Sequence, residues 1–413
     1  MKHVIIGNGP AGVVAAEALR RADPTAEIAL VGDEDAPPYS RMAIPYLLTG
    51  SIGEEGTYLR KDKDHYERLN VRLVVARAEK VDAKARSVKL SNGEKLAYDR
   101  LLIATGSHPL RPTIPGIDSP NVHSCWTLAD AREIAGKAKK GARVVQLGAG
   151  FIGSIILQAL AERGVKLSVV EMGDRMVPRM MTEKAGNLIR LWVESKGVRV
   201  HVNARAEAIS GSGPMQVKLS NGESLECDLV IAAAGVRPNI AFLEGSGVKV
   251  ADGILVDARM QTSVPEIYAA GDVTEAVGFH SGKPELNAIQ PNAADQARVA
   301  AANMAGAQTA MQGSLAINVL DTLGLISTSF GQWEGVTGGD SVELVDEANY
   351  RYLSLQFKDD VLIGATSIGW TDHVGALRGL IQGRVRLGEW KALLLADPTQ
   401  FMAAYLGAAQ KAA

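Results

Sequence analysis

A glycine-rich hexapeptide of the form Gly-X-Gly-X-X-Gly occurs twice, at residues 7–12 and again at residues 148–153. Each copy follows a short apolar segment and precedes a helical pattern. Such a loop lets backbone N–H groups and a helix N-terminus approach a pyrophosphate. One copy alone is also compatible with a simple strand-to-helix turn, but two copies in the same context favour two dinucleotide-binding sites.

The similarity between the two halves extends beyond these loops. The sequence Val-Lys-Leu-Ser-Asn-Gly appears at residues 88–93 and at 217–222, and apolar segments ending in glycine follow at 101–106 and 229–235. Three matched features in one order indicate an internal duplication. We therefore predict an α/β fold with two Rossmann-like dinucleotide-binding domains, each interrupted by a small antiparallel meander that turns at Ser-Asn-Gly.

The expected elements follow the same order in both halves. Apolar runs and helical periodicity predict this series: strands at 4–6, 27–31, 144–147 and 166–170, and helices at 12–21, 153–163 and 292–304. Because a strand motif at 266–273 and the last of these helices come after the second half, we expect the second domain to be inserted in the first.

The pattern changes near residue 313. Strands are expected at 350–357 and 361–366, followed by helices at 372–384 and 389–395. We predict a small α+β C-terminal domain. The predicted boundaries are 1–110 with 240–312 for the first domain, 111–239 for the second and 313–413 for the third.

In each half, an acidic residue lies near the end of the strand that follows the glycine loop and its helix. Such a residue indicates which nucleotide is bound. Glu171 can bond both ribose hydroxyls and would repel a 2′-phosphate, which favours NAD over NADP. Asp33 or Glu34 occupies the matching position in the first half. The alternative for these acids is a solvated turn carboxylate.

Charge and cysteine content exclude several classes of protein. The chain of 413 residues carries 44 basic and 46 acidic side chains, so no overall positive field attracts nucleic acid or anionic membranes. No apolar segment reaches the length of a membrane span. The two cysteines, Cys125 and Cys227, are too few for a disulfide framework or for a cluster held by four cysteines. We expect a cytoplasmic protein without a metal site of its own.

At this point the motifs resemble a known family. The two loops, Ala-Thr-Gly at 104–106 and Tyr-Ala-Ala-Gly-Asp at 268–272 are similar to the FAD-dependent pyridine nucleotide-disulfide oxidoreductases over residues 1 to about 310. Residues 32–34 and 39–41 resemble ferredoxin and rubredoxin reductases and the flavoprotein part of nitrite reductase. Residues 357–360, 364–365 and 379–381 resemble the C-terminal domain of NADH:rubredoxin reductases.

The resemblance implies FAD in the first domain and NAD(H) in the second. The residues it assigns to FAD are Gly7, Gly9, Pro10, Ala11, Gly12, Asp33, Glu34, Arg41, Ala78, Ala104, Thr105, Gly106, Gly271, Asp272 and Gln290. Those it assigns to the nicotinamide nucleotide are Gly148, Gly150, Phe151, Ile152, Gly153, Glu171 and Gly235. No side chain is expected to be catalytic, because the flavin carries the chemistry.

Departures from the family narrow the activity. Where disulfide reductases have their redox cysteines, this chain has Ser40-Arg41-Met42, which excludes reduction through a cysteine pair. A Glu that orients the nicotinamide is replaced by Ile155, and a Lys near the flavin is replaced by Tyr46. These two changes bear on the rate and geometry of hydride transfer, not on the class of reaction.

We therefore expect hydride exchange between NAD(H) and flavin, followed by electron transfer with an external iron–sulfur protein of the rubredoxin or ferredoxin type. The electron partner can also be a subunit of a larger complex, and a homodimer is compatible with the sequence. The alternatives are an NADH oxidase that uses oxygen or a small quinone, and a flavoprotein subunit without catalytic activity.

Overall fold

The computed structural model describes residues 1–412, which form two compact units. Unit 1 contains residues 1–43, 52–108 and 236–315. Of the described residues, unit 2 contains 44–51, 109–235 and 316–412. The three domain boundaries predicted from the sequence stay a prediction.

A five-stranded parallel sheet forms the centre of unit 1, in the order β19-β7-β1-β2-β3. Its strands are β1 (Lys2–Ile6), β2 (Glu27–Gly32), β3 (Val71–Val75), β7 (Arg100–Ile103) and β19 (Ile267–Ala269). The last strand comes from far along the chain and pairs with β7. This pairing confirms that the second nucleotide-binding fold is inserted in the first.

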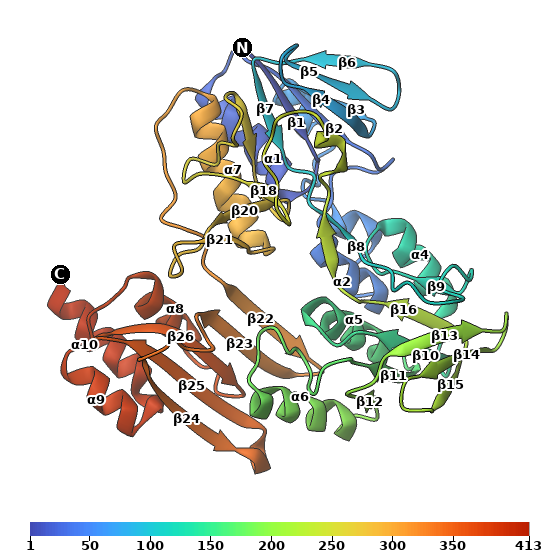
Figure 1. Ribbon diagram of the computed structural model, residues 1–413, viewed down its shortest axis with the longest axis vertical. Helices are drawn as coiled ribbons and strands as arrows, with labels where there is room; N and C mark the ends of the chain where they lie inside the picture. The colour runs from blue at the N-terminus through green and yellow to red at the C-terminus, as the bar shows by residue number, and fades with distance from the viewer. Residues whose placement is uncertain (413) are drawn as a thin grey trace. The chain divides into compact units, whose positions relative to one another are not determined.

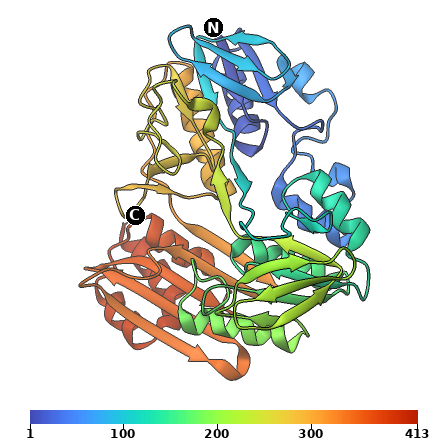
Figure 2. The same ribbon diagram turned by 45° about the vertical axis from the view of Figure 1, so that its right-hand side comes forward.

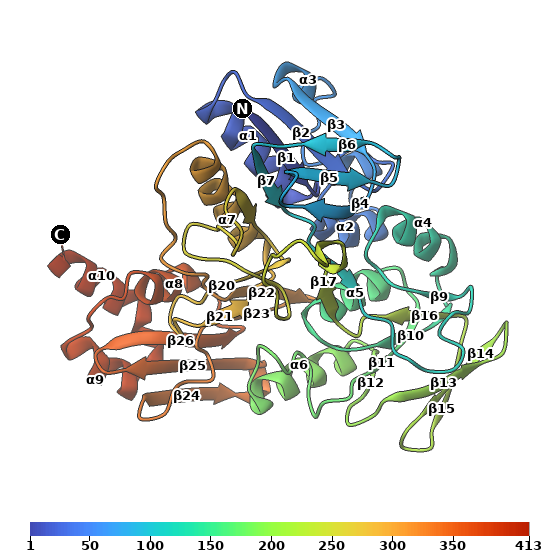
Figure 3. The same cartoon turned by 45° about the horizontal axis from the view of Figure 1, so that its top comes forward.

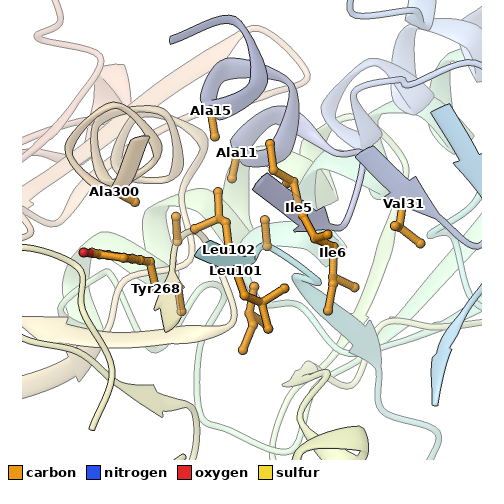
Figure 4. Packing of buried hydrophobic residues seen from close by; sticks show 14 of the residues in the cluster. Ile5, Ile6, Ala11, Ala15, Val31, Leu101, Leu102, Tyr268 and Ala300 are labelled. Carbon is orange, nitrogen blue, oxygen red and sulfur yellow. The ribbon is translucent and has the colours of Figure 1, made fainter. Parts of the chain in front are cut away.

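Two helices with small side chains pack together beside this sheet, α1 (Pro10–Ala22) and α7 (Gln290–Met304) (Figure 1). Their buried faces are rich in alanine, including Ala15 on α1 and Ala300 on α7. Small residues allow two helix axes to approach closely. Figure 4 shows these alanines beside Leu102 and Tyr268 in the same apolar core.

The helices after both glycine loops begin earlier than predicted. The sequence placed their first residues at Gly12 and Gly153, whereas α1 begins at Pro10 and α5 (Phe151–Glu162) begins at Phe151. Gly9 and Gly150 are the extended N-cap residues, so the second half of each glycine motif already belongs to the first helical turn. Helix α7 likewise begins two residues early, because Pro291 suits the first turn of a helix.

Both predicted meanders are confirmed (Figure 3). They consist of β4 (Ala78–Asp82), β5 (Ser87–Leu90) and β6 (Lys95–Ala97), and of β13 (Ala206–Ser210), β14 (Met215–Leu219) and β15 (Ser224–Cys227). The turns match in detail. Gly93 and Gly222 have φ of 86° and 88°, and the side chains of Asn92 and Asn221 each accept a hydrogen bond from the backbone N–H two residues on.

Smaller elements complete unit 1. A three-stranded sheet contains β18 (Ile254–Leu255), β20 (Thr274–Val277) and β21 (Pro284–Leu286), and β8 (Ser107–Pro109) pairs with β17 (Val236–Pro238). The short helices are η1 (Arg41–Ala43), η2 (Glu54–Thr57), α3 (His65–Arg68) and η3 (Ala241–Leu243).

Unit 2 contains the second parallel sheet, in the order β12-β11-β10-β16-β9. Its strands are β9 (Val122–His123), β10 (Arg143–Leu147), β11 (Lys166–Val170), β12 (Arg199–His201) and β16 (Leu229–Ala232). Besides α5, its helices are α2 (Ile44–Thr49), α4 (Leu128–Lys137) and α6 (Glu183–Ser195). Helix α2 packs against α4 and α5.

The C-terminal part of unit 2 is an antiparallel five-stranded sheet with helices packed on it (Figure 2). The strands, in sheet order, are β22 (Ile317–Thr322), β23 (Leu325–Gly331), β26 (Val361–Ile368), β25 (Arg351–Lys358) and β24 (Asp340–Asp346). The helices are η4 (Glu347–Asn349), α8 (Val374–Gln382), α9 (Glu389–Ala396), η5 (Pro398–Gln400) and α10 (Phe401–Ala412). The α+β character is confirmed, although the sequence predicted only β25 and β26 of the five strands.

Polar contacts join this C-terminal sheet to helix α6. The indole Nε1 of Trp192 donates to the backbone oxygen of Thr322 at 3.0 Å, and the hydroxyl groups of Thr182 and Tyr352 are 2.9 Å apart. Among residues 1–412, no helix combines the length and the apolar character needed to cross a bilayer.

Two glycines of α8 provide a test of packing in the C-terminal part. A methyl carbon added at Gly379 would lie 2.6 Å from Cε2 of Tyr405 on α10, whereas one added at Gly375 would meet nothing within 4 Å. Gly379→Ala should therefore destabilise the protein by about 1–3 kcal/mol. Gly375→Ala should be neutral or stabilise by up to about 1 kcal/mol through higher helix propensity.

Denaturant unfolding of both variants checks this pair. Equal stability changes for the two substitutions would contradict the packing of α8 on α10.

Candidate functional site

The first glycine loop is held by close backbone contacts. Gly7 has φ of 107°, and a side-chain carbon there would lie 2.1 Å from the carbonyl oxygen of Ala104 on the adjacent segment. A side-chain carbon at Gly12 would lie 1.8 Å from the oxygen of Gly7. The N–H of Gly7 donates to Val31 at 2.7 Å. Glycine is therefore required at both ends of the motif for the chain to fold.

The second loop repeats this arrangement. Gly148 has φ of 104°, and a side-chain carbon there would lie 2.3 Å from the oxygen of Ala233. At Gly153 the corresponding distance is 2.5 Å, to the oxygen of Gly148. The buried amide of Gln146 also donates to the oxygens of Gly148 and Gly153, at 2.9 Å each. The sequence analysis did not predict this role of Gln146, which fixes the second loop through its backbone oxygens.

The middle glycine of each motif has a different environment. Gly9 and Gly150 have ordinary φ values of −74° and −69°, and a side-chain carbon at either would meet nothing within 4 Å. The fold itself therefore does not demand glycine at these positions. Open space directly at a helix N-terminus is what a pyrophosphate needs for close approach to backbone N–H groups.

Several of the other residues predicted for FAD directly follow strands of the unit 1 sheet. Asp33 and Glu34 follow β2, Thr105 follows β7, and Asp272 follows β19. Because all five strands are parallel, their carboxyl ends meet at the same edge. Of the other predicted residues, Gly106 and Gly271 lie after β7 and β19, Arg41 begins η1, Ala78 begins β4 and Gln290 begins α7. Their roles at the cofactor stay predictions.

The two candidate ribose acids of unit 1 differ in their surroundings. Asp33 is exposed. Glu34 accepts a hydrogen bond from the Tyr39 hydroxyl at 2.7 Å and pairs with the Arg41 guanidinium at 2.9 Å. Arg41 also donates to the oxygen of Ser107 at 3.3 Å. Glu34 is thus part of a network that positions Arg41, and Asp33 retains its carboxylate for a ligand.

Asp272 is a partly buried carboxylate at the same edge. Burial raises the pKa of Asp272, an effect that Arg41 and a 3.5 Å contact with the Ser107 hydroxyl only partly oppose. The amide oxygen of Gln296 accepts hydrogen bonds from the N–H of Gly271 at 2.7 Å and from the Thr274 hydroxyl at 3.0 Å. Gln296 is fully buried in α7 and holds the Ala-Gly-Asp segment, a role that sequence reasoning did not predict.

Glu171 occupies the corresponding position in unit 2. It is buried, and its two carboxylate oxygens accept hydrogen bonds from the N–H groups of Ala149 at 2.7 Å and Gly173 at 2.8 Å. These contacts fix the acid beside the glycine loop, and a carboxylate oxygen can accept further hydrogen bonds. Gly235, with φ of 109°, follows β16 at the same sheet edge, and Phe151 and Ile152 open α5.

The two departures from the family pattern both lie in unit 2. Ile155 is partly buried in α5, and Tyr46 on α2 is 60% exposed. Neither position carries a formal charge, although α2 and α5 pack against each other. The site therefore lacks the charged pair that the resemblance would have placed there.

Two parallel sheets, each with a glycine loop opening a helix and an acid after the next strand, define an oxidoreductase that holds two dinucleotides. Residues 1–308 match the pyridine nucleotide-disulphide oxidoreductase family. The chain belongs to this family, and its cofactors are FAD and NAD(H).

Similar proteins support the same class along nearly the whole chain. The epsilon subunit of the NADH-dependent phenylglyoxylate dehydrogenase of Aromatoleum evansii is 32% identical, over 96% of this chain and 95% of its own length. A rubredoxin-NAD(+) reductase of Ectopseudomonas oleovorans is 29% identical, over 92% of this chain and 99% of its own. A ferredoxin reductase structure from Rhodopseudomonas palustris is 29% identical with a TM-score of 0.82, covering 90% of this chain and 92% of that one.

The two middle glycines give a matched test of the predicted sites. Gly9→Ala and Gly150→Ala should each leave the stability of the cofactor-free protein nearly unchanged, because the added methyl group meets no protein atom. Gly9→Ala should weaken FAD binding, and Gly150→Ala NADH binding, each by roughly a hundredfold through the blocked pyrophosphate.

Thermal unfolding reports the stability of each variant, flavin content reports FAD binding, and NADH titration reports NADH binding. The site assignment is wrong if Gly9→Ala does not selectively weaken FAD binding, or if Gly150→Ala does not selectively weaken NADH binding. Gly12→Ala is the control for folding, since its methyl group would collide with Gly7 and should destabilise the protein outright.

Asp272 gives a test that depends on pH. Because the folded state raises its pKa, the folded cofactor-free protein binds the proton more strongly than the unfolded chain does. Stability is therefore lost as pH rises above the ordinary Asp value of about 4. Asp272→Asn should make the cofactor-free protein more stable at neutral pH, and the two curves should converge in acid.

The same substitution should weaken FAD retention by about tenfold or more, through the lost hydrogen bonds of the carboxylate. Unfolding measured across pH without cofactor, together with flavin content after dialysis, checks both effects. A variant less stable than the wild type at neutral pH would contradict the burial effect.

Proposed function

We propose that this protein is an NADH-dependent flavoprotein reductase that exchanges electrons between NAD(H) and an external iron–sulfur protein or partner subunit. The observation that carries the proposal is the pair of equivalent glycine loops with open middle positions in a chain with no usable thiol. The flavin supplies the exchange between hydride and single-electron chemistry. The protein contributes binding, orientation and the exclusion of competing reactions.

The environment of the two cysteines supports a mechanism without a redox-active cysteine or disulfide. Cys125 and Cys227 are free and buried, and burial raises the pKa of both thiols to about 12. A thiol is nucleophilic as the thiolate, so neither residue is suited to disulfide exchange at neutral pH. Free buried thiols also fit a reducing compartment, and we propose a cytoplasmic location.

The named relatives support the choice of partner. One is a rubredoxin reductase and one is a subunit of a larger NADH-dependent dehydrogenase, and both match almost end to end. The C-terminal sheet is part of this match. Since no second redox centre is evident in the composition of the chain, electrons must leave to another protein or to a small acceptor.

Anaerobic titration of the FAD-loaded protein with NADH tests the proposal. The visible absorbance of the flavin should bleach with one equivalent of NADH, and NADPH should be much less effective because Glu171 would repel its 2′-phosphate. Gly150→Ala is the matched control, since it should keep FAD and lose reduction by NADH. Flavin that stays oxidised would refute the reductase and support a non-catalytic subunit.

A second measurement distinguishes the acceptor. Oxidised rubredoxin or ferredoxin should reoxidise the reduced flavin much faster than air does, and purification of the native complex should recover an iron–sulfur companion. Rapid NADH consumption in air without any protein partner would instead establish an NADH oxidase.

A further inference from the structure

The chain passes between the two units at several points, and two of these passages run side by side. It leaves unit 1 after residue 108 and returns to it at residue 236. Strand β8 at the first passage pairs with strand β17 at the second, and the N–H of Leu110 donates to the oxygen of Gly235 at 2.8 Å. We call these paired strands, with Leu110 and Gly235, the β8–β17 ribbon. Neither passage can move independently while these hydrogen bonds are formed.

Asn239 directly follows β17 and makes four hydrogen bonds to residues 105–108 of the other passage. Its N–H donates to the oxygen of Gly106 at 3.0 Å, and its backbone oxygen accepts from the Thr105 hydroxyl at 2.9 Å. Its side-chain nitrogen donates to the backbone oxygen of Thr105 at 2.8 Å, and its side-chain oxygen lies 2.6 Å from Nδ1 of His108. All of these residues belong to unit 1.

The two side-chain contacts of Asn239 need a donor and an acceptor in the same group. The amide nitrogen must face the carbonyl oxygen of Thr105, because that oxygen can only accept. The amide oxygen therefore faces His108, and since this oxygen cannot donate, Nδ1 of His108 carries the proton. An aspartate here would point a carboxylate at the carbonyl of Thr105, and an alanine would make neither contact.

The segment that Asn239 holds is in contact with the predicted flavin site. Ser107, two residues after Thr105, lies 3.5 Å from Asp272 through its hydroxyl group. Its backbone oxygen accepts a hydrogen bond from Arg41 at 3.3 Å. The family resemblance assigns Thr105, Asp272 and Arg41 to FAD. A shift of this segment would therefore displace several groups of the predicted flavin site together.

The strand before Asn239 begins at the predicted nicotinamide site. Gly235 is assigned to the nicotinamide nucleotide by the resemblance, and it directly precedes β17. Its φ of 109° is a conformation that favours glycine, and its oxygen is bonded to Leu110 of the other passage. Three residues of strand thus separate a residue predicted for NAD(H) from the residue that holds the flavin segment.

We propose that Asn239 is a positioning residue for hydride exchange between NAD(H) and flavin. It fastens β17 to residues 105–108, so that the strand from the predicted nicotinamide fold and the segment at the predicted flavin site move as one piece. Hydride transfer requires a close and aligned approach of the reacting atoms, and a misplacement of about 1 Å can lower the rate by about a hundredfold. This role rests on the proposed function, because it requires both nucleotides to react.

Stopped-flow reduction of the FAD-loaded full chain by NADH tests this role. Asn239→Ala removes both side-chain contacts and should lower the rate constant of flavin reduction at saturating NADH by about tenfold or more. The FAD content and the dissociation constant of NADH should stay within about twofold of the wild type, because neither glycine loop is changed. The amplitude of the absorbance change reports the fraction of folded, FAD-loaded protein. A merely structural defect would lower this amplitude and leave the rate constant unchanged.

Two further variants are matched to Asn239→Ala. His108 is exposed and provides one of the two side-chain contacts, so His108→Ala should lower the same rate constant by a smaller factor, about threefold. Arg237 is exposed on β17, and within residues 1–412 no hydrogen bond or ion pair is found for its side chain. Arg237→Ala should therefore be reduced at the wild-type rate.

Hydrogen exchange provides a measurement that does not need the reaction. If Asn239 holds the β8–β17 ribbon together, the amide of Leu110 should exchange about tenfold faster in Asn239→Ala than in the wild-type full chain. Arg237→Ala should leave this exchange rate unchanged, because its side chain makes no contact that ties the two strands.

The outcomes separate this role from the proposed function. Wild-type flavin that NADH leaves oxidised contradicts the proposed function, and the positioning of hydride transfer with it. Normal reduction of the wild type, with an equal rate constant for Asn239→Ala, overturns the positioning role alone. The role is also overturned if only the amplitude decreases, or if Leu110 exchanges at the same rate in Asn239→Ala and in the wild type.

Discussion

Both nucleotide-binding folds depend on a carbonyl oxygen that occupies the space where a side chain would be. Ala104 supplies it to Gly7, and Ala233 supplies it to Gly148. In each sheet this contact ties the glycine loop of the first strand to the end of its neighbour, β7 or β16. The direction of the following helix, and hence the position of its N-terminus, is set by this backbone packing.

Around these loops the side chains divide into those that support the backbone and those that remain available. Gln146 and Gln296 are buried amides that hold backbone groups of the two sites. Asp33 is exposed and supports no backbone group, and the space beside Gly9 and Gly150 is not filled by other protein atoms. Both thiols are buried and protonated, so neither is available for redox chemistry. The chemistry of the predicted sites must therefore come from the bound nucleotides.

Much of the fold could be predicted because the chain repeats itself. The duplicated loops and Ser-Asn-Gly turns identified both parallel sheets and both meanders, and the strand motif at 266–273 identified the insertion. Strands β22, β23 and β24 were missed. In β23 the residues Ser327, Thr328 and Ser329 are fully buried, so the strand does not show the apolar alternation that indicates a half-buried strand. The pairing of Glu34 with Arg41 depends on tertiary packing that one sequence does not reveal.

The late arrival of β19 has a consequence for synthesis on the ribosome. The second parallel sheet is assembled from one continuous stretch, residues 122–232, whereas the first needs β19 and α7, which emerge only after it. Domains generally fold as units as they leave the ribosome. The second sheet can therefore close during translation while the first still lacks its last strand, so the fold predicted to bind FAD is completed last.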